Sequence, residues 1–166
     1  MRSKEGLRFL KSFLYAFRGI VYCINNERNM RIHTVAALYV FVFSFFFEMS
    51  RARYAVVFIA MAMVIVAEIF NTVAEELSDM AAPSFNPVVR MIKDTSAGGV
   101  LVCAIFSFLV GACIFWQPAS FVKMAQFFIT KPLMLLPLAL VTAISVVYIA
   151  MGPVGIRDYI RNKRNK

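Results

Sequence analysis

The stretch AEIFNTVAEELSDMAAPSFNPVVRMIKDTSAGGV, residues 67–100, decides the fold of this chain, because acidic, amide and lysine side chains appear there at the end of an apolar run. Five of the nine acidic residues of the chain lie in it. On a helix of about 100° per residue, Glu76 falls outside a narrow polar stripe. That stripe, within an arc of about 80°, consists of Glu68, Asn71, Glu75 and Asp79.

This acidic stripe continues a run from Tyr54 to Ala67 that carries no charge, which is typical of a membrane-spanning helix. If Tyr54 marks one membrane boundary, Glu68 lies about 21 Å along the axis, within a hydrocarbon layer roughly 30 Å thick. A carboxylate at that depth costs about 2.5 to 3.5 kcal/mol on insertion, so we interpret Glu68 as a functional group that faces protein or water. The alternative is that Glu68 begins a loop and reaches water along its own side chain.

The composition places the chain among integral membrane proteins, since 61% of its 166 residues are hydrophobic. Its net charge of +9 would suggest nucleic acid as the partner of a soluble protein. The basic residues are instead next to apolar segments, so we expect an anionic membrane surface and no nucleic acid. Three cysteines, Cys23, Cys103 and Cys113, form no CxxC motif and indicate neither a disulfide framework nor a zinc site.

The pattern predicts an all-α integral membrane bundle with an amphipathic surface helix, three membrane spans and a fourth, C-terminal span. Residues 50–53 are expected to form a turn, the two prolines in 82–87 to end the second span, and Gly152-Pro153 to end the fourth. Three units follow: a surface helix and turn (1–29), a three-span core (30–116), and an interfacial segment with an accessory span and basic tail (117–166). The predicted elements are the surface helix 4–24, a polar break at 25–29, spans at 30–48, 54–77 and 97–116, a helical approach at 88–94, an interfacial segment at 119–130, and a span at 131–151.

The distribution of basic residues predicts the orientation of these spans. Fourteen of the eighteen lie on the side that holds both termini and the loop after the acidic stripe. Because basic residues favour the cytoplasmic side, we expect both termini in the cytoplasm, where nucleotide is available.

The polar residues at this face fit phosphoryl transfer, which needs a group to orient or deprotonate the acceptor, carboxylates to hold magnesium, and a cation. Glu68 suits the first role, Glu75 with Glu27 the second, and Lys93 the third. A P-loop of the GxxxxGK[ST] type is absent from the sequence. The alternative is a small proton- or cation-conducting subunit, which would also carry intramembrane acids but would not require Lys93 or Glu27.

The segment Glu68-Ile69-Phe70-Asn71-Thr72-Val73-Ala74-Glu75, followed by Asp79 and by Lys93-Asp94, resembles the signature of the small bacterial diacylglycerol kinase and undecaprenol kinase family. Tyr15-Ala16-Phe17-Arg18-Gly19, ahead of Asn26-Glu27-Arg28-Asn29, is similar to the surface helix and first turn of that family. The resemblance covers residues 8–116.

The resemblance implies a homotrimeric lipid kinase of the bacterial inner membrane, whose sites form between subunits and which uses ATP and Mg²⁺. By resemblance, Glu68 is the catalytic base, and Glu27 and Glu75 bind the metal. The nucleotide and phosphate site would be lined by Arg8, Tyr15, Glu27, Asn71, Glu75, Lys93 and Asp94.

Two features depart from the family pattern. Ala97 stands where some members have a serine, which favours undecaprenol over diacylglycerol as the lipid. The residues after Gln117 exceed the usual family length, so the fourth span has no assigned motif.

Overall fold

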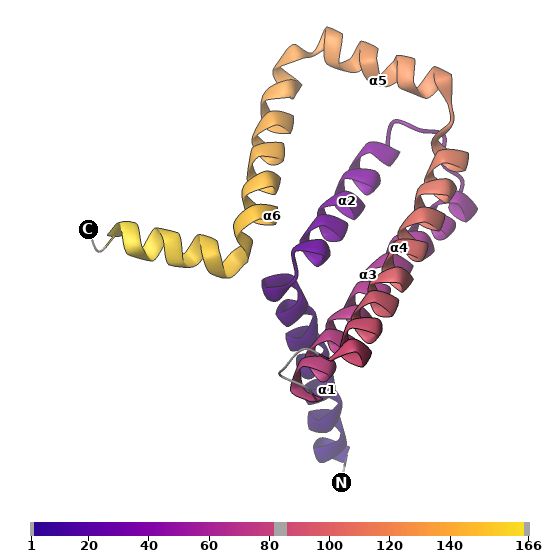
Figure 1. The fold of residues 1–166 in the computed structure, drawn as a ribbon. Helices are drawn as coiled ribbons and strands as arrows, with labels where there is room; N and C mark the ends of the chain where they lie inside the picture. The colour runs from indigo at the N-terminus through magenta and orange to yellow at the C-terminus, as the bar shows by residue number, and fades with distance from the viewer. Residues whose placement is uncertain (1, 82–85, 165–166) are drawn as a thin grey trace.

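The protein is a chain of α-helices joined by short connections, as seen in a computed structural model (Figure 1). The structure describes residues 2–81 and 86–164, with side chains from residue 6 onward. The predicted all-α fold is confirmed. Of the two prolines predicted to end the second span, Pro83 lies outside the described residues and Pro87 begins the next helix. The elements are α1 (Arg2–Asn26), α2 (Arg28–Ser44), α3 (Arg51–Ala81), α4 (Pro87–Phe115), α5 (Pro118–Thr130), the short η1 (Pro132–Met134) and α6 (Leu135–Arg164).

The centre of the fold is the hairpin of α3 and α4, which lie side by side along most of their length (Figure 1). The hydroxyl of Ser107 on α4 donates to the carbonyl of Ala60 on α3 at 2.9 Å. The predicted turn at residues 50–53 is wrong, because α3 already begins at Arg51. The Ser50 hydroxyl accepts from the backbone N–H of Arg53 at 3.3 Å, which is the bond of an N-capping serine and explains the earlier start.

Within residues 2–81 and 86–164, three helical segments are long and apolar enough to cross a membrane: α3, α4 and residues 132–164. The first predicted span, 30–48, is shorter than expected, since α2 ends at Ser44 after 17 residues. That length corresponds to about 26 Å, somewhat less than the roughly 30 Å of a hydrocarbon layer. The rings that follow leave the helix axis: Phe46 packs against Phe127 and Phe128 of α5, and Phe47 packs against Phe115 and Phe121.

The C-terminal part of the chain folds back over the bundle. Helix α5 crosses one end, and α6 then returns beside α2, where the hydroxyls of Tyr39 and Thr142 are 2.8 Å apart (Figure 1). The fourth predicted helix is interrupted at Gly152-Pro153, where it was predicted to end: the backbone of Gly152 is non-helical, and a second helical stretch of α6 continues to Arg164 in a new direction. Gly152 allows this bend with φ of 65° and ψ of 169°, a conformation open essentially to glycine alone.

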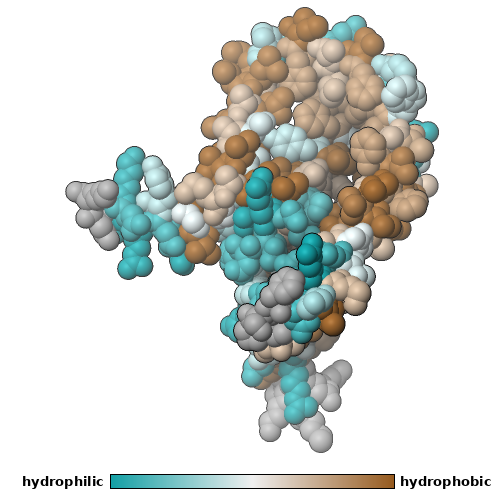
Figure 2. Space-filling view, in the orientation of Figure 1, coloured by the Kyte–Doolittle hydropathy of each residue, from teal (hydrophilic) through white to brown (hydrophobic). Residues whose placement is uncertain are grey.

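The surface divides into an apolar body and a polar end. Figure 2 shows hydrophobic residues over the part of the molecule formed by α2, α5 and the first half of α6, and hydrophilic residues gathered where α1 meets α2 and α3 meets α4. The corner between α1 and α2 is tight, since Glu27 alone separates them. We refer to residues 24–31 as the α1–α2 corner.

Candidate functional site

The most unusual side chain of the structure is Glu68, which is 0% exposed on the inner face of α3. Neither of its carboxylate oxygens has a hydrogen-bond partner among the described residues. Asn29 of the α1–α2 corner lies near the carboxylate without reaching hydrogen-bond geometry. Because a buried polar group without a partner is costly, such a group is typical of a site where a ligand or substrate supplies the partner.

Two further carboxylates lie near Glu68: Glu27 from the α1–α2 corner and Glu75 from the same helix, α3. Glu27 precedes α2 at the α1–α2 corner, and its side chain makes no capping bond, so its oxygens are free for another partner. The pKa of Glu27 is raised by its partial burial and by the negative charges of Glu75 and Glu76, while Arg31 opposes the rise. Glu27 and Glu75 both act electrostatically on Glu68 as well. We call Glu27, Glu68, Glu75 and Glu76 the acidic cluster.

Asn71 links the acidic cluster to α4. Its side-chain N–H donates to Glu75 Oε1 at 2.9 Å, and its Oδ1 accepts from the hydroxyl of Ser96 at 2.7 Å. The amide is therefore held in one orientation by these two bonds. Ser96 was not predicted from the sequence, because its bond to Asn71 depends on how α4 aligns with α3. The available signal was that Ser96 lies three residues after Lys93, on the same face of the helix.

The lysine and the second aspartate of the predicted site point in different directions. Lys93 pairs with Asp79 of α3 at 2.6 Å, which brings its ammonium group to the end of the acidic stripe. Asp94 pairs instead with Arg90 on its own helix at 3.7 Å, and both side chains are 73% exposed. The structure thus joins Lys93 to the acidic stripe and leaves Asp94 on the outer surface of α4.

The two predicted site residues of α1 lie away from the acidic cluster. Arg8 and Tyr15 are exposed, and neither side chain makes a hydrogen bond to the cluster among the described residues. The guanidinium of Arg18 lies 6.0 Å from the centre of the Tyr15 ring. The residue of α1 that does reach the cluster is Tyr22, whose hydroxyl donates to Glu76 Oε1 at 2.5 Å. Tyr22 was not predicted from the sequence.

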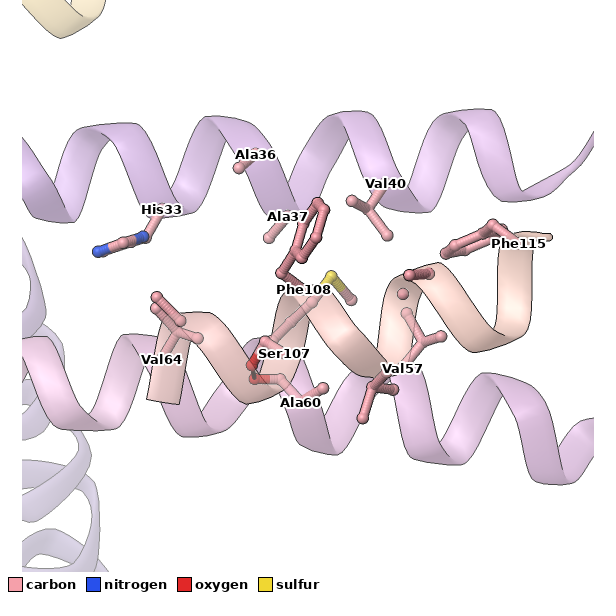
Figure 3. A pocket seen from close by; sticks show the side chains of 15 residues that line it. His33, Ala36, Ala37, Val40, Val57, Ala60, Val64, Ser107, Phe108 and Phe115 are labelled. Atoms are coloured by element: carbon pink, nitrogen blue, oxygen red, sulfur yellow. Dashed lines mark hydrogen bonds between the residues drawn. The ribbon is translucent and has the colours of Figure 1, made fainter. Parts of the chain in front are cut away.

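An apolar groove of about 370 Å³ lies between α2, α3 and α4 (Figure 3). Val64 lines it, and Glu68 follows Val64 by one helical turn, about 6 Å along α3. His33 lines the same end from α2, one turn after Asn29. The groove therefore leads towards the buried carboxylate. Figure 3 labels His33, Ala36, Ala37, Val40, Val57, Ala60, Val64, Ser107, Phe108 and Phe115 as lining side chains.

The residues of the acidic cluster fit a hard divalent cation. Carboxylate oxygens are the ligands that Mg²⁺ prefers, and this ion commonly takes only one or two protein carboxylates together with phosphate oxygens and water. Within the described part of the chain, no group of three or more His, Cys, Asp or Glu is arranged to hold a metal by itself. The pair Glu27 and Glu75 suits a metal that arrives with a phosphate ligand.

Comparison with known proteins identifies relatives for most of the chain. Residues 14–115 match the family described as prokaryotic diacylglycerol kinase. The undecaprenol kinase of Bacillus subtilis is 34% identical over 108 residues, which cover 65% of this chain and 88% of that protein. The diacylglycerol kinase of a Synechocystis species is 32% identical over 110 residues, which cover 66% of this chain and 63% of that protein.

The hydrogen bond between Tyr22 and Glu76 predicts how the phenol of Tyr22 titrates. The pKa of Tyr22 is raised above 10.0, first by the hydrogen bond to Glu76 and then by burial and the charge of that carboxylate. The bond exists only while the phenol is protonated, so it is lost as the pH rises through the raised pKa. In tyrosinate absorbance, the difference between wild type and Tyr22→Phe isolates this titration. We expect Glu76→Gln to move it to lower pH and Glu48→Gln, far from Tyr22, to leave it in place; an unmoved titration in Glu76→Gln would contradict the bond.

Proposed function

Because the chain belongs to the prokaryotic diacylglycerol kinase family and is a lipid kinase, we propose that it transfers the γ-phosphoryl group of ATP to the hydroxyl of undecaprenol or diacylglycerol. Its relatives are named for these two activities, which sets aside the alternative of a conducting subunit. Ala97 and the name of the Bacillus relative favour undecaprenol.

The observation that carries this proposal is the buried carboxylate of Glu68, which has no partner and lies one turn beyond the apolar groove. A lipid whose tail lies in the groove would present its hydroxyl to Glu68, whereas a soluble acceptor would not enter from the hydrocarbon. Glu68 then takes the proton of that hydroxyl as its oxygen attacks the γ-phosphorus. The bond between the γ-phosphorus and the bridging oxygen breaks, and ADP leaves.

The nucleotide site is proposed around the outer part of the acidic cluster. Glu27 and Glu75 would hold Mg²⁺ on the phosphates, because both are partly exposed carboxylates on the polar side of Glu68. When bound, Mg²⁺ would offset the negative charge of the phosphates. Asn71 offers a fixed N–H donor, and Lys93, already oriented by Asp79, offers a cation for the transferred group.

The remaining site residues suggest a shared site. Arg8, Tyr15 and Asp94 lie on exposed surfaces outside the acidic cluster of their own chain. We therefore propose that the enzyme is a homotrimer and that residues of α1 reach the nucleotide of a neighbouring subunit. We also propose the inner membrane as its location, with both termini cytoplasmic, and residues 30–116 as the kinase core between the surface helix (1–29) and the C-terminal extension (117–166).

Replacing the proposed base tests its role directly. Glu68→Gln keeps the shape of the side chain but cannot accept the proton. We expect kcat to fall by about 10² to 10⁴-fold, with the affinity for ATP little changed. Glu48→Gln, an exposed acid at the opposite end of the bundle, serves as control and should keep wild-type rates. A Glu68→Gln enzyme with normal kcat and weak nucleotide binding would make Glu68 a binding residue instead.

The metal assignment predicts a second pattern. In Glu27→Gln and Glu75→Gln, the apparent KM for Mg²⁺ should rise, or turnover should cease, because one of the two proposed carboxylate ligands is missing. Binding of Mn²⁺ in the presence of a non-hydrolysable ATP analogue, measured by electron paramagnetic resonance, should weaken in parallel. If both variants showed the metal dependence and Mn²⁺ affinity of the wild type, neither residue could be a ligand.

The shared site predicts complementation. Arg8→Ala and Glu68→Gln are each expected to be poorly active alone. Mixed assemblies should recover activity, because Arg8 from one chain can serve an intact Glu68 in another. A mixture of Glu68→Gln with Glu75→Gln should not recover, since both residues belong to the acidic cluster of a single chain. Absence of recovery in assemblies shown to contain both Arg8→Ala and Glu68→Gln chains would place Arg8 with its own subunit or outside the site.

A further inference from the structure

Arg31 is a buried cation that joins three segments of the chain. Only 7% of it is exposed, and no acidic side chain of the described residues lies within ion-pair distance. One guanidinium nitrogen, Nη1, donates to the carbonyls of Ile24 and Asn25 at 3.0 and 3.1 Å, at the end of α1. The Nε–H donates to the carbonyl of Ile149 on α6 at 3.1 Å. The buried charge is thus satisfied by backbone oxygens alone, which fixes its position closely.

The bend of α6 provides the place for this side chain. In a regular helix, the carbonyl of Ile149 would accept from the N–H of residue 153, but Pro153 has none. The Nε–H of Arg31 supplies the missing donor. Gly152 leaves room for the guanidinium, since a Cβ atom there would lie 2.9 Å from Nη1. Gly152 thus provides space for the guanidinium of Arg31, and Pro153 leaves the Ile149 carbonyl available to accept its Nε–H.

Arg31 is also close to a carboxylate of the acidic cluster. Its backbone N–H donates to the carbonyl of Glu27 at 3.4 Å, one helical turn earlier. Its charge acts on the Glu27 carboxylate in opposition to Glu75 and Glu76. Because Glu27 lacks a capping bond of its own, the backbone of the α1–α2 corner decides where its carboxylate points. The carbonyls of that corner are the ones that Arg31 holds.

We propose that Arg31 is a positioning residue for Glu27, and that the C-terminal extension takes part in the metal site by holding Arg31 in the Gly152-Pro153 bend. The proposal rests on the metal role of Glu27 given above. It assigns a task to a helix that lies beyond the residues matched by the family and that the sequence predicts to be an accessory anchor. The extension contributes no ligand; it restrains the corner that carries one.

The test uses the full chain with substitutions on the side of α6. Gly152→Ala should displace Arg31, and Gly155→Ala is the matched control, because a Cβ at Gly155 meets only ordinary contact with Met151. We expect Gly152→Ala to raise the apparent KM for Mg²⁺ and to weaken Mn²⁺ binding by about tenfold, with kcat at saturating Mg²⁺ within about twofold of wild type. Arg31→Lys, which keeps the charge but cannot reach all three carbonyls, should act in the same way and serves if Gly152→Ala does not fold.

Cys23 reports on the corner independently of metal and turnover. It is 4% exposed, and its carbonyl accepts from Glu27 N–H at 2.8 Å. With Cys103 and Cys113 replaced by Ala, we expect a maleimide to label Cys23 about tenfold faster in Gly152→Ala than in Gly155→Ala. The proposal would be overturned if Cys23 were labelled no faster in Gly152→Ala and in Arg31→Lys than in Gly155→Ala.

Measurements of Mn²⁺ binding distinguish a failure of the positioning role of Arg31 from a failure of the metal role of Glu27. If Glu27→Gln weakens Mn²⁺ binding but neither Gly152→Ala nor Arg31→Lys does, the positioning role is wrong and the metal role of Glu27 stands. If Glu27→Gln leaves Mn²⁺ binding unchanged, the metal role itself fails, and the positioning role fails with it.

Discussion

A carboxylate within a membrane-spanning helix has to be kept from the lipid, and the arrangement of the bundle follows from where Glu68 is placed. The residues of α3 that face inward include the apolar Val57 and Val64, followed by the polar Glu68 and Asn71. Helix α3 therefore changes character along one face, from apolar to polar. The α1–α2 corner and the first turns of α4 surround the polar part, while α2 and the second half of α4 border the apolar groove. A single helix face thus brings an apolar groove and the acidic cluster to adjoining positions.

The site itself depends on the junctions between helices more than on a packed core. Tyr22 ties α1 to α3, Ser96 ties α4 to α3, and Lys93 ties the start of α4 to Asp79. Each of these bonds joins polar side chains of two different helices. An exposed ion pair such as that of Lys93 and Asp79 adds little to stability, so its effect is to orient the two side chains that it joins. The apolar side chains that cover the rest of the helices are suited to lipid or to neighbouring subunits.

The periodicity of the sequence was enough to predict the inner face of α3, because a single unbroken helix carries it. Glu68 and Asn71 are buried together on that face, and Glu76, predicted to lie outside the stripe, points towards Tyr22. The partners of these residues could not be predicted, since Tyr22 and Ser96 meet α3 through tertiary packing. The Gly-Pro pair could be predicted from the sequence to interrupt the helix, but its tertiary partner could not. Its missing N–H is replaced by a donor from 122 positions earlier in the sequence.

The contact between Arg31 and the bend of α6 also bears on how such an extension can be acquired. Two of the three carbonyls held by Arg31 belong to the end of α1, within the residues that match the family. The arginine therefore has an internal task in the core, and its Nε–H is the donor that bonds the added segment. An added helix can attach here through a glycine that leaves room for the guanidinium and a proline that leaves a carbonyl without its usual donor. This attachment uses a single N–H of the core.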